Sequence, residues 1–237
     1  MGVCRKLNLI CGTVRGMSDS LFRQSRTLIL TQPEEVEAYI SDELGFDSVV
    51  LVEALERAGS EAAMTTQHNA ASAFGYRFWD GMVASVRDRL VPLGWRVERP
   101  GGLEVVRRSD NRLQITGSLG DDAVGIESAD PNCRHQKGQS SDEAMRTNQL
   151  TLDGLAGDDP AWRPMLTWWV LYRFAGFDDR RIISELSLPR EGSSGRVAEW
   201  EVRLFLPEFQ IGGSGGIDLA LPEPPAPIDI PVRRVGT

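Results

Sequence analysis

Cysteine and histidine are both scarce in this chain of 237 residues. The cysteines Cys4, Cys11 and Cys133 lack the spacing of a disulfide framework, which disfavours a small secreted disulfide-rich fold. The two histidines, His68 and His135, lie far apart in the sequence. Only Cys133 and His135 are close neighbours, and a structural zinc site usually needs a second pair of ligands. We expect a polar loop there, with no metal and no cofactor.

Lysine is limited to Lys6 and Lys137, and neither follows a glycine-rich turn. A P-loop needs its lysine directly after such a turn, and no dinucleotide-binding glycine pattern occurs. Kinases, P-loop nucleotidases and ordinary dehydrogenases are therefore disfavoured. The other basic residues are all arginines, and alanine and glycine are abundant. This composition indicates a GC-rich genome, that of a bacterium or a mobile element.

Long apolar runs are also missing, since no stretch approaches the roughly 20 residues of a membrane-spanning helix. At the N-terminus Arg5 and Lys6 precede an apolar segment, but Asn8 interrupts it and it is too short for a signal peptide. Acidic residues outnumber basic ones, 34 to 26, for a net charge of −8. This charge argues against a surface that binds phosphates all over, although it permits a local basic patch. We expect a cytoplasmic protein with no membrane partner.

Helical periodicity is clearest from Asn69 to Leu93. The spacing of its apolar residues predicts a long amphipathic helix that lies across a sheet. The stripe consists of Phe74, Phe78, Met82, Val86, Leu90 and Leu93. Two shorter helices are predicted before it, one after Thr31 and one after Asp47. Their outer face is rich in glutamate, which favours an ordinary helical hairpin over a DNA-binding one.

After Gly94 the apolar residues alternate with polar ones, which is typical of strands. Strands are predicted at 95–99, 103–108, 112–117, 123–127, 166–174, 180–188 and 199–206. Turns rich in glycine, proline and asparagine join the first of them, which predicts antiparallel neighbours. The predicted fold class is α+β: a long amphipathic helix packed on an antiparallel β-meander of about six or seven strands, with a helical N-terminal appendage.

The predicted organisation along the chain follows from these elements. Residues 1–63 form the helical appendage, with an over-extended gene start as the alternative because the chain from Met64 onward resembles a complete protein. Residues 64–211 form the α+β core, with a mobile loop at about 130–164 that is too long for an ordinary connection. Residues 212–237 are rich in glycine and proline, which predicts a flexible tail.

One hydrolase motif is matched only formally. Residues Gly212 to Gly216 fit the G-x-S-x-G pattern of the nucleophile elbow, in which a strand and a helix flank the serine. A proline-rich tail follows here, and no histidine comes after the serine to complete a triad. We therefore assign no catalytic residue to this motif.

Acidic residues gather in and beside the first predicted strands: Glu104, Asp121, Asp122, Glu127 and Asp130. A Mg²⁺-dependent nuclease needs carboxylates on neighbouring strands, because they hold the ion that activates water at a phosphate. Such a site also wants a lysine near the acids, and arginine is a poor substitute because its charge is fixed. A nuclease that uses these carboxylates is the enzymatic alternative, and a solvated strand edge is the simpler interpretation.

The segment from Gln149 to Leu155 lies inside the predicted polar loop. It resembles the bacterial sliding-clamp-binding peptide, in which Gln, Leu, a variable residue and Leu precede a large apolar residue. Gln149, Leu150 and Leu152 match this pattern, whereas Asp153 stands in the aromatic position and Leu155 comes late. Such peptides bind in an extended form, with side chains that enter a preformed pocket. The resemblance implies a sliding clamp as one partner, and the alternative is an amphipathic segment packed on the domain.

Adjacent tryptophans mark the strand predicted at 166–174. Trp168 and Trp169 point to opposite faces of a strand, so one of them is expected to be exposed. With Arg173 nearby, an exposed indole would stack on the bases of a single-stranded nucleic acid. Burial of both tryptophans in a core is the alternative.

These features favour a non-enzymatic binding or accessory protein of a bacterial or mobile-element system. It would engage a protein or nucleic-acid partner through the sheet face and the polar loop. The predicted partner-binding residues are Gln149, Leu150, Leu152, Leu155, Trp168, Trp169 and Arg173. The alternatives are the Mg²⁺-dependent nuclease and, on net charge alone, an acidic mimic of DNA.

Overall fold

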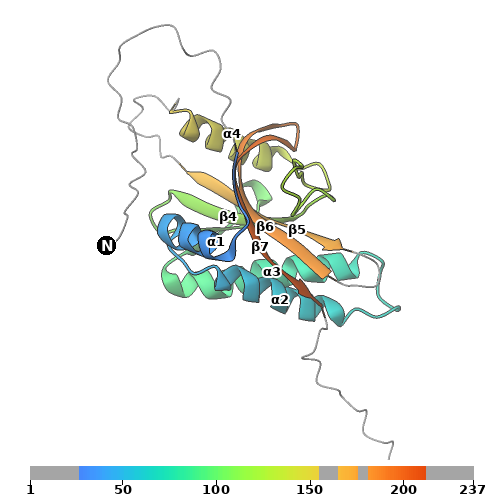
Figure 1. Cartoon of the computed structure of the whole chain (residues 1–237). Helices are drawn as coiled ribbons and strands as arrows, with labels where there is room; N and C mark the ends of the chain where they lie inside the picture. Colours follow the sequence, from blue (N-terminus) through green and yellow to red (C-terminus); the bar gives the residue numbers. More distant parts are fainter. Residues whose placement is uncertain (1–26, 155–164, 176–180, 212–237) are drawn as a thin grey trace, which may run out of the picture.

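The computed structural model describes residues 27–154, 165–175 and 181–211 (Figure 1). They form one sheet with helices on both of its faces, so the α+β class is confirmed. Over these ranges, no helix is both long enough and apolar enough to cross a membrane.

The sheet has seven strands in the order β1-β7-β6-β5-β4-β3-β2. Their bounds are Leu28–Leu30 (β1), Arg96–Glu98 (β2), Val105–Arg107 (β3), Leu113–Leu119 (β4), Leu166–Ala175 (β5), Arg181–Ser193 (β6) and Arg196–Gln210 (β7). Strands β1 and β7 pair in parallel, as do β4 and β5, and the other neighbours are antiparallel. The prediction of a purely antiparallel meander was therefore wrong. The chain crosses one face of the sheet between β4 and β5, and such a crossover returns the next strand in the parallel direction.

Three α-helices cover one face: α1 (Pro33–Tyr39), α2 (Val49–Ala63) and α3 (Ala73–Leu90). Helix α3 is the predicted long helix, and its Phe78, Met82 and Leu90 are buried as the apolar stripe indicated. It ends earlier than predicted, because residues Val91–Leu93 form a 3₁₀ turn that closes at Gly94, whose φ of 89° suits glycine. A short π-helical turn, Ile40–Leu44, joins α1 to the loop before α2.

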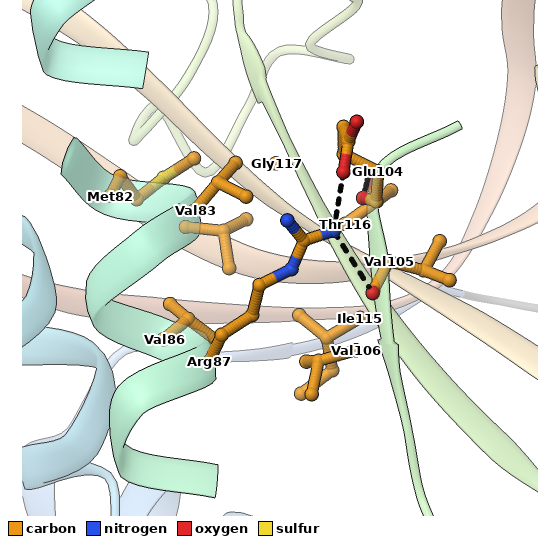
Figure 2. Close-up of a pocket in the computed structure, with 11 residues that line it drawn as sticks. Met82, Val83, Val86, Arg87, Glu104, Val105, Val106, Ile115, Thr116 and Gly117 are labelled. Carbon is orange, nitrogen blue, oxygen red and sulfur yellow. Dashed lines mark hydrogen bonds and ion pairs between the residues drawn. The ribbon is translucent and has the colours of Figure 1, made fainter. Parts of the chain in front are cut away.

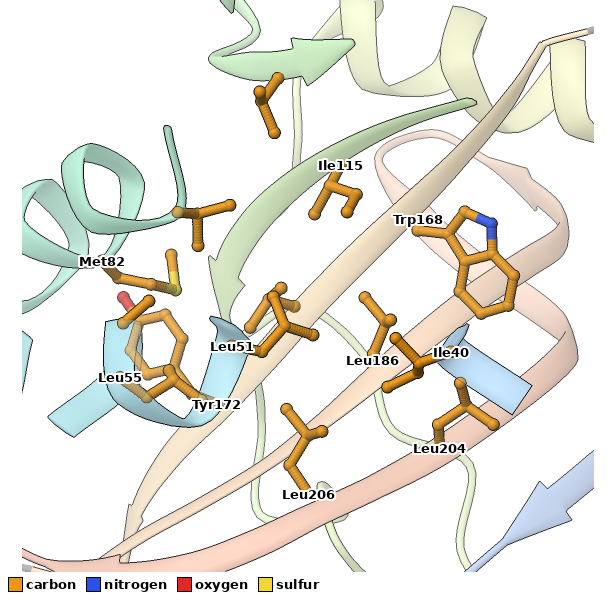
Figure 3. Packing of buried hydrophobic residues seen from close by; sticks show 14 of the residues in the cluster. Ile40, Leu51, Leu55, Met82, Ile115, Trp168, Tyr172, Leu186, Leu204 and Leu206 are labelled. Carbon is orange, nitrogen blue, oxygen red and sulfur yellow. The ribbon is translucent and has the colours of Figure 1, made fainter. Parts of the chain in front are cut away.

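The helices before Met64 belong to the same hydrophobic core as α3 and the sheet. Figure 3 shows Ile40, Leu51 and Leu55 among side chains of the strands and of α3. These three residues are at most 1 % exposed. Strand β1 adds an edge to the sheet through its pairing with β7. The described part of the predicted appendage is thus packed into the central core.

The opposite face is covered by α4 (Gln139–Leu152) and by residues 120–137, here called the 120–137 segment (Figure 1). A second apolar cluster lies under them: Val124, Cys133, Met145, Trp169, Leu171, Val197 and Trp200. Two predictions were wrong here. The stretch predicted as a loop at 130–164 contains α4, and the strand predicted at 123–127 is a run of turns next to an isolated bridge between Gly120 and Cys133.

Candidate functional site

An open hollow of about 440 Å³ lies between the start of α3 and the end of β4. We call it the aromatic groove. It is lined by Ala71, Ser72, Gly75, Tyr76, Trp79, Ser118, Leu119, His135, Lys137 and Tyr172. Its volume is within the usual range of ligand sites, roughly 300–1,000 Å³.

The α3 wall of the groove carries two aromatic side chains one turn apart. Tyr76 is 63 % exposed, and its ring centroid lies 6.1 Å from that of Trp79. The indole N–H of Trp79 donates a hydrogen bond of 3.3 Å to the carbonyl of Gly117, which fixes this ring against β4. Gly75 has no heavy atom within 4 Å of the place where a Cβ would stand, so the wall stays open beside Tyr76. The result is one anchored aromatic ring next to one that faces solvent.

The opposite wall is the end of the 120–137 segment, and many hydrogen bonds hold this segment in place. The backbone N–H of Arg134 donates to the Leu119 carbonyl at 2.9 Å. Asp121 accepts hydrogen bonds from the backbone amides of Ala123 and Asn132. The Asn132 side chain bonds both backbone groups of Val197 on β7. The wall is therefore attached to the sheet rather than free to move.

A buried ion pair fastens the middle of the same segment. Arg203 and Glu185 are 1 % and 0 % exposed, and their charged groups approach to 2.8 Å. Arg203 also donates to the carbonyls of Ala129, at 2.6 Å, and Ile126, at 3.2 Å. Glu185 in turn accepts from the backbone N–H of Gly125. Each buried charge thus has several partners, as a charge in the interior requires.

One edge of the groove, here called the rim, carries the cation Lys137 and the imidazole of His135, with the exposed Arg134 beside them in the chain. Ten arginines of the described chain form ion pairs with carboxylates. The ammonium of Lys137 and the guanidinium of Arg134 form none with any residue that the structure describes. Lys137 is half-buried, whereas Arg134 and His135 are exposed. Lys137 and Arg134 therefore have no ion pair among the described residues that would compete with an external anion.

Cys133 lies beneath this rim, with 1 % of its surface exposed. Burial raises the pKa of its thiol, and the nearby charge of Lys137 offsets only part of that effect. A thiol that stays protonated is a poor nucleophile. The arrangement suits Cys133 to packing in the second apolar cluster rather than to covalent chemistry.

The predicted acidic site is not assembled in the structure. Although burial alone raises the pKa of the Glu104 carboxyl, its hydrogen bonds with Arg87 and Arg99 and their charges lower that pKa below its ordinary value. Asp121 holds backbone amides, and Asp122 and Glu127 are exposed on turns. Within the described ranges, no three His, Cys, Asp or Glu side chains come together as a possible metal site. Glu104 and Asp121 thus make hydrogen bonds inside the protein, whereas Asp122 and Glu127 are each exposed to solvent.

A small cavity of about 20 Å³ lies behind Glu104. Figure 2 shows Arg87 reaching from α3 across this cavity to Glu104 and to the carbonyl of Val105. Met82, Val86 and other apolar side chains line the rest. The space is enough for about one water molecule, so it is a packing defect rather than a ligand site.

The predicted partner-binding residues have other roles. Gln149, Leu150 and Leu152 lie in the last turns of α4 and are half-buried, so this segment is helical where the clamp-binding peptide is extended. Leu155 lies outside the described residues. The helix packs here because Asn148, which is fully buried, bonds the backbone of Thr167 and Pro189.

Both tryptophans of β5 are buried, and neither is exposed for stacking. Trp168 is 2 % exposed in the core under α1–α3, and Trp169 is 1 % exposed in the cluster under α4. The expectation of an exposed indole was wrong because both faces of the sheet are covered. Arg173 donates to the carbonyl of Val124 at 2.7 Å, so it supports the 120–137 segment.

None of the residues that line the aromatic groove was predicted from the sequence as a binding residue. The spacing in α3 placed Trp79 at the margin of the apolar stripe, and Tyr76 falls outside that stripe. An exposed tyrosine beside a glycine was the available signal, and the contact with residues 135–137 was not visible from the sequence. Comparison of the chain with protein-family models, curated proteins and solved structures found no significant match.

Proposed function

We propose that this chain is a non-enzymatic binding protein that engages a protein partner through the aromatic groove. The observation that carries the proposal is the exposed Tyr76 beside the anchored Trp79, opposite Lys137, which forms no ion pair with any residue that the structure describes. Tyrosine, tryptophan and arginine are the residues enriched at the energetic centres of protein interfaces. The whole chain carries a net charge of −8, so the positive charge of this rim is opposite in sign to that of the chain.

The arginine-rich composition supports placing the protein in a bacterial or mobile-element system. The base composition of the coding DNA tests that part. A nucleic-acid partner has less support, because the rim offers few cations on a chain of net charge −8. The nuclease alternative has no specific observation in its favour, since Glu104 is held between Arg87 and Arg99.

Capture of partners from a lysate, with the full chain as bait, tests the proposal. The test variant is Tyr76→Ala with Lys137→Glu, which removes the exposed ring and reverses the rim charge. The matched control is Leu93→Ala with Arg146→Glu, which makes the same kinds of change outside the groove, on the turn after α3 and on α4. We expect nuclease-resistant capture of a protein by the wild type and the control but not by the test variant. Equal capture by all three chains would contradict the assignment of the groove.

A further inference from the structure

We infer that the groove recognises an acidic, aromatic segment of a protein partner: a large aromatic side chain followed directly by carboxylates. This inference rests on the proposed binding function and names the chemistry of the ligand. It follows from the shape of the groove, from the positive charge at one of its sides and from its open borders.

The apolar part of the groove fits an aromatic ring. Tyr76, Trp79 and Leu119 form walls on neighbouring elements, and Trp79 is held by its hydrogen bond to β4. Aromatic rings attract each other in edge-to-face or offset arrangements, and a third ring completes such a cluster. A ring bound there would shield Tyr76, which is otherwise largely in water.

Charge sets the direction of the ligand along the groove. The α3 side of the groove is lined by Ser72, Gly75, Tyr76 and Trp79 and has no charged residue among them. The opposite side carries Lys137 and His135, with the exposed Arg134 beside them in the chain. A carboxylate therefore gains attraction only at the second side. With the ring against Tyr76, the carboxylates of the same segment reach toward Lys137, whose ammonium forms no ion pair with any described residue.

The open form of the groove favours a chain segment over a free small molecule. Ala71, Ser72, Tyr76 and His135 on its borders are all exposed. Small-molecule sites commonly enclose most of their ligand's surface, which these borders do not. A single strand of nucleic acid would need a track of cations along its phosphates, whereas the rim is one short cluster.

The test measures binding of defined peptides to the full chain by isothermal titration calorimetry. The acidic probe is an acetylated and amidated Gly-Ser-Phe-Asp-Asp-Ser-Gly peptide, and its matched control has Asn in place of each Asp. We expect the acidic peptide to bind with a Kd on the order of 100 µM, at least about tenfold tighter than the amide peptide. Lys137→Gln should remove most of that preference, and Tyr76→Ala should weaken both peptides.

Other probes and outcomes separate this inference from the proposed function. Equal affinity for the acidic and amide peptides, or a preference unchanged by Lys137→Gln, would overturn the inference. Phenylacetate binding as tightly as the acidic peptide would overturn the choice of a chain segment, and tighter binding of oligo-dT would overturn the choice of a protein. If partner capture still depends on Tyr76 in any of these cases, the proposed binding function is kept. Only the assignment of an acidic, aromatic segment as the ligand is then rejected.

Discussion

Arg203 and Glu185 meet in the interior with almost no contact with water, and together they hold the turns at Gly125, Ile126 and Ala129 against the sheet. Taking two charges out of water costs several kcal/mol for each ion, and only good geometry offsets that cost. The pair therefore positions the 120–137 segment. Its largest effect on stability is expected when one partner is removed and the other charge stays buried without a partner.

Arg203→Met should lower the free energy of unfolding by about 3–5 kcal/mol, because it leaves the Glu185 carboxylate buried without its partner. Urea denaturation, followed by circular dichroism, measures this change. The double variant Glu185→Leu with Arg203→Met should be more stable than Arg203→Met alone, since no unpaired charge is left. A double variant less stable than the single one would contradict this explanation.

Glu104 gives a prediction for pH dependence. Its pKa in the folded protein lies below the ordinary value of 4.5 because Arg87 and Arg99 favour the charged form. The stabilisation is therefore fully present above the unfolded-state pKa and is lost as pH falls through the folded-state pKa. The difference in unfolding free energy between wild type and Glu104→Gln should be largest near neutral pH and shrink below about pH 4. Denaturation series at several pH values measure it, and a difference that grows on acidification would contradict it.

At the scale of elements, the turn between β6 and β7 supports the groove from a distance. Gly195 has a φ of 71°, and its carbonyl accepts a hydrogen bond from the backbone N–H of Lys137. A Cβ at Gly195 would lie 2.3 Å from the carbonyl oxygen of Lys137 and 2.5 Å from its nitrogen. These are backbone atoms, which cannot rotate out of the way as the end of a side chain can.

Gly195→Ala should therefore displace Lys137 as well as introduce left-handed strain. We expect a loss of about 2–4 kcal/mol in unfolding free energy and weaker partner capture. Gly102→Ala is the matched control, because Gly102 has a φ of 83° but no heavy atom within 4 Å of its Cβ position. The control should lose only about 1–2 kcal/mol and keep its capture. Equal losses in the two variants would show that the contact with Lys137 is unimportant.

The elements that the sequence predicted well are those with a regular apolar pattern. Helix α3 and strand β7 have one, and their packing follows it, whereas the edge strand β1 (Leu28–Leu30) has none and was not predicted. Helix α4 also lacks one: its buried residues are Ser141, Ala144, Met145 and Asn148, a small and partly polar set that resembles a loop. Because α4 was not predicted, the connection from β4 to β5 looked like a loop rather than a helical crossover. The parallel pairing of these two strands was therefore not predicted. The groove joins residues about sixty positions apart, and no local pattern reports such a contact.

At the scale of the whole molecule, the helices before Met64 are part of the core. Ile40, Leu51 and Leu55 are each at most 1 % exposed, and burial of such a side chain stabilises a protein by about 1.5–3 kcal/mol. For these three side chains alone the sum is comparable with the roughly 5–15 kcal/mol by which a typical domain is stable, so removal of α1, α2 and β1 should abolish the folded state.

A chain that starts at Met64 should therefore fail to unfold cooperatively, while a chain of residues 27–211 should show a sharp thermal transition by circular dichroism. The reason is that truncation uncovers the face of the sheet under α1 and α2. A sharp transition of the shorter chain, at a temperature close to that of the longer one, would contradict the single shared core.

The central claim is that partners bind at the aromatic groove, and backbone hydrogen exchange of the full chain with and without its captured partner tests it most directly. The groove account predicts slower exchange in the partner complex at residues 71–79 and 133–137, with little change in α4. Protection confined to residues 149–152 of α4, one of the two places where the sequence alone put the partner, would contradict it.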